Sequence, residues 1–212
     1  PYIDGDKISI LKDAMISCEQ LSLDFDTVFA NTNTSYEPDE NGRSSGKTGS
    51  DIERILAFHA IGREDPVEYQ DSWANTLQHA LQIEQEYMDK IYREKLTDLQ
   101  YQVTRNSATE RAFTGIYDKH FDTGTYYCIC CNHPLFESTG KYNSGCGWPA
   151  FHSEHKSANI ARIEDYTYGM SRIEVRCSKC DAHLGHVFND GPRDHGGERY
   201  CINSASIEFR DS

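Results

Sequence analysis

Two pairs of cysteines constrain the fold of this 212-residue chain more than any other feature. Cys128 and Cys131 form one Cys-x-x-Cys pair, and Cys177 and Cys180 form the other. Two intervening residues let both thiolates of a pair bind one ion at a tight turn, and four such sulfurs complete the tetrahedral shell of a Zn²⁺ ion. Because a closed shell leaves no open coordination position, we expect one zinc ion per chain with a structural role.

The two pairs are separated by 45 residues, so the ion would join distant parts of one fold and would not close a single finger. Cys130 could replace Cys128 or Cys131 as a ligand, although the two-residue gap favours Cys128 and Cys131. Accidental spacing and a redox-active Cys-x-x-Cys motif are the alternatives to a zinc site.

Cysteine usage also bears on the cellular compartment. An even count of eight would suit the disulfide framework of a small secreted protein, but seven of the eight cysteines follow residue 127. This clustering favours metal binding and redox chemistry in a reducing compartment. We expect the cytoplasm. An organelle is the alternative, because the sequence starts at Pro1 and not at a methionine, so that a targeting segment could have been removed. No apolar run approaches the roughly 20 residues that span a bilayer, so we expect no membrane insertion.

Charge divides the chain into two regions. The net charge is −13, which opposes non-specific binding to phosphate and argues against a nucleic-acid partner. Residues 1–96 hold 9 basic and 19 acidic residues, a net charge of −10, whereas the remainder has a net charge of −3. We therefore expect an acidic N-terminal extension over residues 1–94 and a separate domain over residues 95–212.

The extension has the periodicity of helices around a polar loop. Apolar residues at helical spacing predict a helix near residues 6–20, and residues 31–50, rich in Asn, Thr, Ser and Gly, predict a loop. A capping pattern at Ser50 and Glu53 predicts a helix that Gly62 ends. No catalytic constellation is present, and the sequence does not state what this region does.

A second capping pattern, Asp65-Pro66-Val67-Glu68, predicts a long helix that continues to about residue 95. One face of this helix is apolar, and we interpret it as a packing surface. The face consists of Trp73, Leu77, Ala80, Tyr87 and Ile91.

A third capping pattern, Thr97 with Gln100, predicts a shorter helix. After this helix the residue pattern changes from helical periodicity to strand-like alternation. Short alternating runs, separated by Gly, Asn, Asp and Pro, then predict strands at residues 125–129, 173–176 and 202–209. Strands and helices do not alternate here, so a small antiparallel β fold is expected and a parallel sheet is not.

One run in this β region contains a candidate nucleophile. The run from Arg199 to Ser206 alternates like a strand, with Arg199, Cys201 and Asn203 on one face. A guanidinium beside a thiol favours the thiolate, which is the reactive form. The alternative is a buried cysteine that only packs.

The sequence offers partners for this thiol. Cys146 lies between two glycines, a setting for a mobile resolving thiol that condenses with a sulfenic acid to a disulfide. His183 and His186 could supply acid–base catalysis, or could be structural or a second metal site. Asp190 and Asn203 could orient an imidazole or hold a substrate group.

Residues 95–209 resemble the methionine-R-sulfoxide reductases, the MsrB family. Five runs carry the resemblance: Tyr101–Arg105, Glu110–Gly115, Ser144–Pro149, His183–Phe188 and Arg199–Ser206. Residues 1–94 have no counterpart in that family. The resemblance implies two small antiparallel sheets joined by a zinc ion on Cys128, Cys131, Cys177 and Cys180, preceded here by a mostly helical extension.

The resemblance also implies an activity. Cys201 would attack the sulfur of an R-configured methionine sulfoxide, free or in a protein, and Cys146 would resolve the product. Thioredoxin would then reduce the Cys146–Cys201 disulfide. Trp148 would lie against the substrate methyl group, with Phe188 also in contact with the substrate.

In the same family pattern, five polar residues surround the sulfoxide oxygen and the nucleophile. These residues are His183, His186, Asp190, Arg199 and Asn203. Cys18 and Cys130 are additional thiols that could resolve the intermediate instead of Cys146.

A zinc-ribbon module that binds another molecule without catalysis is the competing hypothesis. The net negative charge weighs against a nucleic-acid ligand for such a module. Cys146 and Cys201, which zinc does not need, favour the enzyme.

Overall fold

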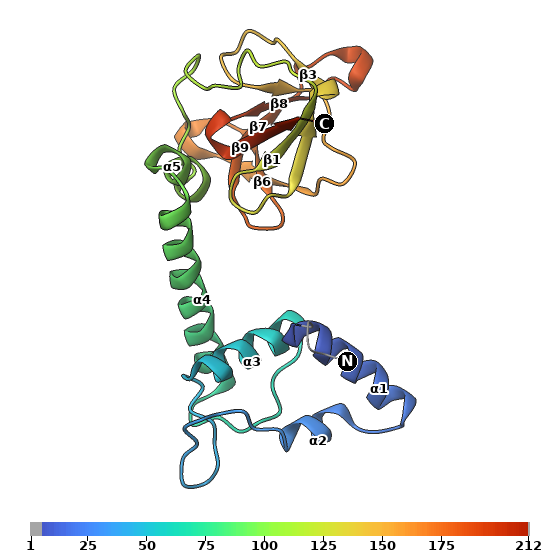
Figure 1. The fold of residues 1–212 in the computed structure, drawn as a ribbon, viewed down its shortest axis with the longest axis vertical. Coiled ribbons are helices and arrows are strands. Elements are labelled where there is room, and N and C mark those ends of the chain that lie inside the picture. The colour runs from blue at the N-terminus through green and yellow to red at the C-terminus, as the bar shows by residue number, and fades with distance from the viewer. Residues whose placement is uncertain (1–5, 212) are drawn as a thin grey trace. The chain divides into compact units, whose positions relative to one another are not determined.

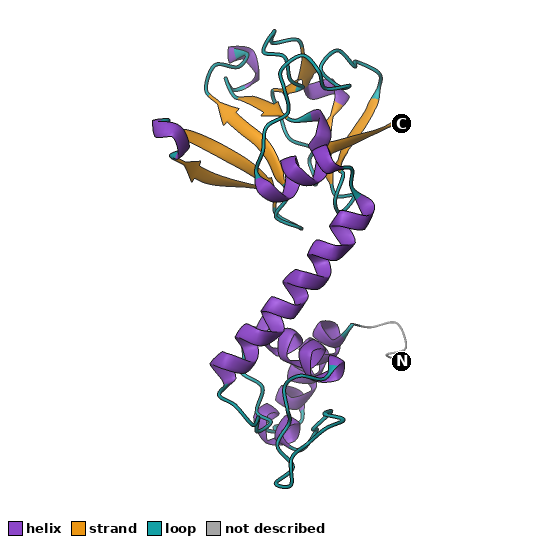
Figure 2. Ribbon diagram, turned by 90° about the vertical axis from the view of Figure 1, so that its left-hand side faces the viewer, coloured by secondary structure: helices purple, strands orange, loops and turns teal. Residues whose placement is uncertain are grey.

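The computed structural model describes residues 6–211, and the chain forms two compact units (Figure 1). The N-terminal unit ends at Lys90, and the C-terminal unit begins at Ile91. Within residues 6–211, all strands lie in the C-terminal unit, and residues 6–90 form helices and loops (Figure 2). This architecture confirms the predicted fold class, a mainly antiparallel β region preceded by a helical region. None of the helices within residues 6–211 is long and apolar enough to cross a membrane.

The helical part begins with four helices. They are α1 (Lys7–Gln20), α2 (Phe25–Ala30), α3 (Gly49–Ala60) and α4 (Trp73–Lys95), the last of which crosses the boundary between the units. Their small core contains Leu11, Cys18 and Phe25 packed against Ala57 and Phe58. The predicted helix near residues 6–20 is confirmed as α1, with the Asp6 carboxylate accepting from the backbone N–H of Ser9 at its start.

The predicted cap of the next helix was wrong by two residues. Helix α3 starts after Thr48, whose side chain and that of Asp51 form a reciprocal capping box. The hydroxyls of Ser44 and Ser45 also donate to Asp51, at 2.9 and 3.0 Å, so tertiary contacts select this carboxylate over that of Glu53. Gly62 follows the helix with φ +74°, as the sequence predicts.

The helix predicted from Asp65 was also misplaced, since α4 begins at Trp73. Asp65 is instead buried against the guanidinium of Arg54, at 2.5 and 2.8 Å, and accepts from the Tyr69 hydroxyl at 2.7 Å. Tyr69 also pairs with Ser44 in an isolated bridge. These contacts hold residues 65–72 in an irregular conformation until the helix starts.

The C-terminal unit contains helix α5 (Asp98–Asn106) and two antiparallel sheets. The predicted cap is confirmed, because Thr97 and Gln100 form a capping box. The three-stranded sheet has the order β2 (Pro134–Glu137), β1 (Gly124–Cys128), β9 (Ile207–Asp211). The six-stranded sheet has the order β3 (Lys141–Tyr142), β4 (Ala150–Phe151), β8 (Arg199–Ile202), β7 (His183–Phe188), β6 (Arg172–Cys177), β5 (Ile160–Asp165).

Aromatic rings from both sheets form the core of this unit. The rings of Phe136 (β2) and Phe151 (β4) stack at 4.4 Å, and Tyr126 (β1) packs edge-on against Phe151 at 5.1 Å. All three side chains are buried. The packed core gives strand β8, which contains Cys201, a rigid support.

The strand predicted at residues 202–209 was wrong as one continuous element. Strand β8 ends at Ile202, and a 3₁₀ turn at Ser204–Ser206 leads into β9 of the other sheet. The turn is buried, and the Glu110 carboxylate accepts the hydrogen bonds of the Ser204 and Ala205 backbone N–H groups. The backbone there needs no strand partner, although the residue types alternate as they would in a strand. Arg199 and Cys201 nevertheless share one face of β8, as expected.

Candidate active site

The four cysteines of the two pairs converge on one point. The sulfurs of Cys128, Cys131, Cys177 and Cys180 all lie within 4.8 Å of one another. Cys128 is the last residue of β1, and Cys177 is the last residue of β6, so the cluster joins the two sheets. Cys130 is buried next to the cluster but is not one of the four.

The spacing of these sulfurs fits a metal ion. Cys128 and Cys180 are 3.6 Å apart between sulfurs, as are Cys131 and Cys177. A tetrahedral shell with metal–sulfur bonds of about 2.3 Å separates its sulfurs by about 3.8 Å. The cluster can therefore hold one metal ion, and its four thiolates suit zinc.

Cys201 lies in the middle of the six-stranded sheet. It pairs with Ala150 on β4 on one side and with His186 on β7 on the other. The neighbouring Gly185 approaches so closely that an added Cβ would lie 2.0 Å from the Cys201 carbonyl oxygen. Regular strands on both sides thus fix the backbone of the candidate nucleophile.

Cys146 reaches this site from the loop between β3 and β4. Gly145 and Gly147, on either side of it, have φ angles of +73° and +90°, which favour glycine. The sulfurs of Cys146 and Cys201 are 3.6 Å apart. A disulfide needs a separation of about 2.05 Å, so a small movement of the loop would join them.

The two thiols determine each other's ionisation. The contact between the two sulfurs lowers the pKa of Cys146. The same contact, with burial, raises the pKa of Cys201, whereas the guanidinium of Arg199 acts in the opposite direction. One thiolate therefore forms readily in the pair, and two adjacent thiolates are disfavoured.

Arg199 is held beside the thiols by two neighbours. The Asp190 carboxylate accepts two hydrogen bonds from it, at 2.8 and 2.9 Å, and this contact lowers the pKa of Asp190. The guanidinium also lies 4.6 Å from the centre of the Phe188 ring. Asp190 thus orients the cation and does not contact an imidazole.

A pocket of about 120 Å³ opens beside Cys201. It is lined by Thr109, Trp148, Arg172, Gly185, His186, Phe188, Cys201 and Asn203. The volume is well below the roughly 300–1,000 Å³ of drug-sized sites, so it suits the end of one side chain. Its wall contains both apolar rings and polar groups. A bound group with one apolar side and one polar side can therefore be held in a single orientation.

A strand irregularity decides where the two histidines point. Side chains three residues apart on a regular strand face opposite sides. The register of β6 and β7 shifts between Val175 and Arg176, and the rings of His183 and His186 lie 5.6 Å apart. The bulge therefore brings both imidazoles to one region of the sheet.

The histidines nevertheless differ in exposure. His183 is 1% exposed and donates from Nδ1 to Glu174 at 2.5 Å, and burial lowers its pKa. His186 lines the pocket and donates from Nε2 to Asp165 at 2.8 Å. Of the two, only His186 can reach a ligand in the pocket.

Glu110 connects the pocket walls. Its backbone oxygen accepts from the Trp148 indole at 3.1 Å, and its backbone N–H donates to the Asn203 side chain at 3.0 Å. Its buried carboxylate accepts from the backbone N–H groups of Ser204 and Ala205, at 2.6 and 2.9 Å. One residue thus holds the indole, the amide and the turn that follows the nucleophile strand.

Sequence reasoning did not assign four residues of this site. Thr109 and Arg172 line the pocket, Asp165 holds His186, and Glu110 braces the walls. Glu110 lies within a run that resembles the MsrB family, which was a usable signal. Asp165 and Arg172 join the site only through the pairing of β5, β6 and β7, and no local pattern marks them.

Comparisons with known proteins cover the same part of the chain. Residues 96–211 match the SelR domain family. The chain is 54% identical over 121 residues to the peptide methionine sulfoxide reductase MsrB of Burkholderia thailandensis, covering 57% of this chain and 85% of the relative. The protein of the same name from Burkholderia multivorans is 55% identical over 121 residues, again covering 57% of this chain and 85% of the relative. The match extends over most of the reductase, and the chain therefore belongs to the MsrB family of peptide methionine sulfoxide reductases.

Proposed function

We propose that Cys201 reduces the R epimer of methionine sulfoxide and that residues 95–212 are the catalytic domain. The observation that carries this proposal is the pair of thiols, 3.6 Å apart, beside a small pocket with an indole and an imidazole in its wall. A binding module without catalysis would leave these two sulfurs without a role.

In the first step, Cys201 passes its proton to the neighbouring Cys146 thiolate, and the resulting Cys201 thiolate attacks the sulfoxide sulfur while the oxygen takes up a proton. Because Asp165 accepts from Nε2 of His186, Nδ1 is the nitrogen that remains for proton transfer. The oxygen passes to Cys201, giving a sulfenic acid and the free thioether. His183 is buried and hydrogen-bonded to Glu174, so it does not donate the proton.

The selectivity for one epimer would come from the two sides of the pocket. Trp148 and Phe188 offer apolar surface to the methyl group, while His186 and Asn203 offer polar atoms toward the oxygen. The opposite epimer would place its oxygen against the rings, where it would lose hydrogen bonds on leaving water.

In the second step, the Cys146 thiol condenses with the sulfenic acid to form a disulfide and water. An external dithiol of the thioredoxin type would return both cysteines to thiols and become a disulfide itself. This cycle requires a reducing compartment, the cytoplasm or an organelle.

The four-cysteine cluster would bind one Zn²⁺ through Cys128, Cys131, Cys177 and Cys180. Such an ion would supply structural cross-linking only, because four thiolates leave no open coordination position. Cys130 would stay outside the shell as a buried thiol.

The test is turnover of the separate R and S epimers of a dabsylated methionine sulfoxide. The wild type should reduce only the R epimer, and Cys201→Ser should lose turnover by more than about a thousandfold, as expected for removal of a covalent nucleophile. Equal reduction of both epimers, or an active Cys201→Ser protein, would refute the proposal. Cys146→Ser should complete one turnover and then stop cycling with thioredoxin.

A further inference from the structure

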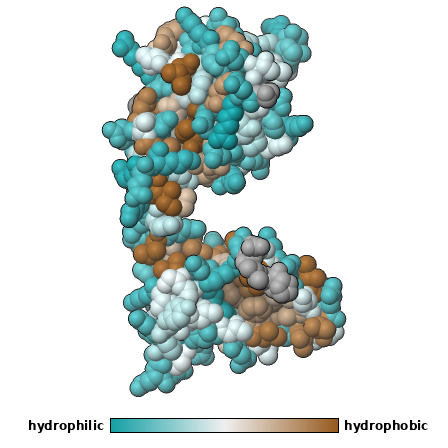
Figure 3. Space-filling view, in the orientation of Figure 1, coloured by the Kyte–Doolittle hydropathy of each residue, from teal (hydrophilic) through white to brown (hydrophobic). Residues whose placement is uncertain are grey.

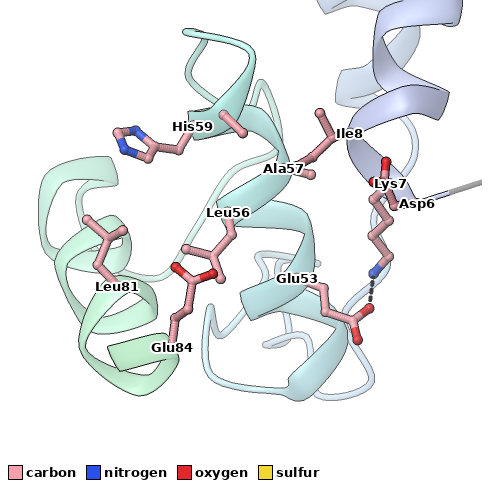
Figure 4. A pocket seen from close by; sticks show the side chains of 10 residues that line it. Asp6, Lys7, Ile8, Glu53, Leu56, Ala57, His59, Leu81 and Glu84 are labelled. Atoms are coloured by element: carbon pink, nitrogen blue, oxygen red, sulfur yellow. Dashed lines mark ion pairs between the residues drawn. The ribbon is translucent and has the colours of Figure 1, made fainter. Parts of the chain in front are cut away.

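A groove on the N-terminal unit lies outside the reductase chemistry. It has a volume of about 650 Å³ and is formed by the start of α1, one face of α3 and the middle of α4 (Figure 4). The close-up shows Leu81 and Glu84 of α4 facing Leu56 of α3, with His59 also on α3. All of these residues precede Lys90, so the groove belongs entirely to this unit.

The floor of the groove is a continuous stripe of α3. Glu53 and Ala57 are four residues apart, as are Leu56 and Ala60, so the four side chains lie on one side of the helix. The two alanines keep the floor low between the flanking helices. Leu81 is 39% exposed, so α4 leaves an apolar side chain open to a ligand at the edge. The shape is that of a site that receives one further helix.

The rim of the groove is acidic. Lys7 pairs with Glu53 at 2.8 Å, so the one lysine in the lining is already neutralised. Asp6 and Glu84 remain as acidic lining residues, and no ion pair joins Glu84 to a cation within residues 6–211. Residues 1–90 contain 7 basic and 18 acidic residues, a net charge of −11.

We propose that this groove binds a basic amphipathic helix of another protein. Apolar side chains of that helix would cover Leu56 and Leu81, and flanking lysines or arginines would pair with Glu84 and the acidic α1 start. A second copy of this chain is a poor occupant, because two units of net charge −11 repel each other. The inference does not depend on the redox mechanism.

The first test uses peptide probes with the full chain. A labelled peptide of about 20 residues, with leucines at helical spacing and lysines elsewhere, is long enough to form a helix on binding. We expect a dissociation constant of about 10 µM or below at low salt, measured by fluorescence anisotropy. A peptide with glutamates in place of the lysines, and a lysine peptide with serines in place of the leucines, should each bind at least tenfold more weakly.

The second test compares variants with matched controls. Glu84→Lys should weaken binding of the leucine–lysine peptide at least tenfold. Glu19→Lys changes the net charge equally at an exposed site outside the groove and should have less than a twofold effect. Leu81→Asp should likewise weaken binding, whereas Leu23→Asp should not.

Leu23 suits this purpose because it is 52% exposed and is not part of the groove. It lies in the turn between α1 and α2, and brown atoms gather on the part of this unit formed by these helices in the space-filling view (Figure 3). Ile16, Leu21 and Val28 are also exposed there. Binding that falls with Leu23→Asp and not with Leu81→Asp would move the site away from the groove and overturn the proposal.

Three other outcomes would also overturn it. Equal weakening by Glu84→Lys and Glu19→Lys would indicate general attraction to an acidic protein. Equal affinity for the lysine and glutamate peptides would remove the role of charge. Concentration-dependent dimerisation that Leu81→Asp abolishes would identify a second copy as the occupant. Reduction of free methionine sulfoxide should be unchanged in all four variants, which separates this test from that of the catalytic proposal.

Discussion

Cys146 and Cys201 share a hydrogen bond between sulfurs, so the charge state of each depends on the other. The contact raises the pKa of Cys201 and lowers that of Cys146. An enzyme with this arrangement has a thiolate in the site before substrate arrives. Arg199, held by Asp190, keeps positive charge beside whichever sulfur is ionised.

Replacement of Cys146 by serine should therefore change the reactivity of Cys201. A serine hydroxyl is not ionised at neutral pH, so the neighbouring negative charge disappears and the pKa of Cys201 falls. Alkylation of Cys201 by iodoacetamide, followed by peptide mass spectrometry across a pH series, should reach half its maximal rate at a lower pH than in the wild type. A shift to higher pH would contradict the proposed coupling.

Glu110→Gln tests the brace of the pocket. A neutral amide accepts the hydrogen bonds of Ser204 and Ala205 less well than a carboxylate, at a cost of about 1–3 kcal/mol. We expect KM for the sulfoxide to rise about tenfold, with a smaller change in kcat, because the Trp148 wall loosens. In a Trp73→Phe background the emission of Trp148 should also shift.

The control for this brace is Glu208→Gln, which removes a carboxylate paired with Arg210 outside the pocket. It should leave both KM and the Trp148 emission unchanged. A fall in melting temperature of Glu110→Gln without any change in KM would assign Glu110 to stability alone.

Single residues differ in how well a sequence reveals them. Cysteine spacing is a local property, so the metal cluster and the spare thiols could be predicted. Asp165 could not, because it reaches His186 only after β5 pairs with β6 and β6 with β7. The sequence also gives no sign that His183 is more buried than His186. Their positions depend on the register shift between β6 and β7, which two identical residue types cannot reveal.

At the scale of elements, strands β7 and β8 carry most of the site, and their approach depends on glycine. Cys201 and His186 are cross-strand partners, as are Arg199 and Phe188. The absence of a side chain at Gly185 lets the two backbones come close next to Cys201. The position of the Cys201 sulfur thus depends on Gly185, a residue that has no side chain.

Gly185→Ala should distort this pairing. The added carbon would meet the Cys201 carbonyl oxygen at 2.0 Å, and overpacking of this kind costs roughly 1–3 kcal/mol or more. We expect a lower melting temperature and loss of most turnover. Gly196→Ala is the matched control, since its φ is also positive, at +92°, but open space surrounds it. Equal effects of both variants would show that φ and not the close approach matters.

Element boundaries show where sequence patterns reach their limit. The Thr97 cap was predicted correctly because its reciprocal partner, Gln100, lies within the same turn. Ser50 and Glu53 fit the same pattern equally well, but Asp51 has hydroxyl partners from the preceding loop and Thr48 forms the cap. The Asp65 carboxylate accepts a hydrogen bond from the buried guanidinium of Arg54, so it does not cap a helix although the local sequence fits a cap.

At the scale of the whole chain, the four-cysteine cluster links elements far apart in sequence within the C-terminal unit. The proposed zinc would contribute on the order of 10 kcal/mol to folding of that unit, as in other sites where metal binding and folding are coupled. The helical core of the N-terminal unit contains none of the four ligands.

Chelation should therefore affect the two units differently. Removing the metal should abolish the cooperative unfolding transition of the C-terminal unit, while helical circular dichroism from the N-terminal unit persists. Elemental analysis should find one zinc per chain in the wild type and in Cys130→Ala, and a strongly reduced content in Cys177→Ala. Full stability after metal loss, or loss of zinc in Cys130→Ala, would contradict the assigned cluster.

The turn at Ser204–Ser206 carries a consequence for the enzyme under stress. It leads from the strand of Cys201 directly into β9, where Ile207 pairs with Cys128 of the metal cluster. A strong oxidant that attacks the cluster thiolates would release the proposed zinc ion and loosen β9, and with it the strand of Cys201. Mild oxidation produces the methionine sulfoxide that this enzyme reduces, whereas strong oxidation would inactivate the enzyme by damaging the cysteine cluster that supports its fold.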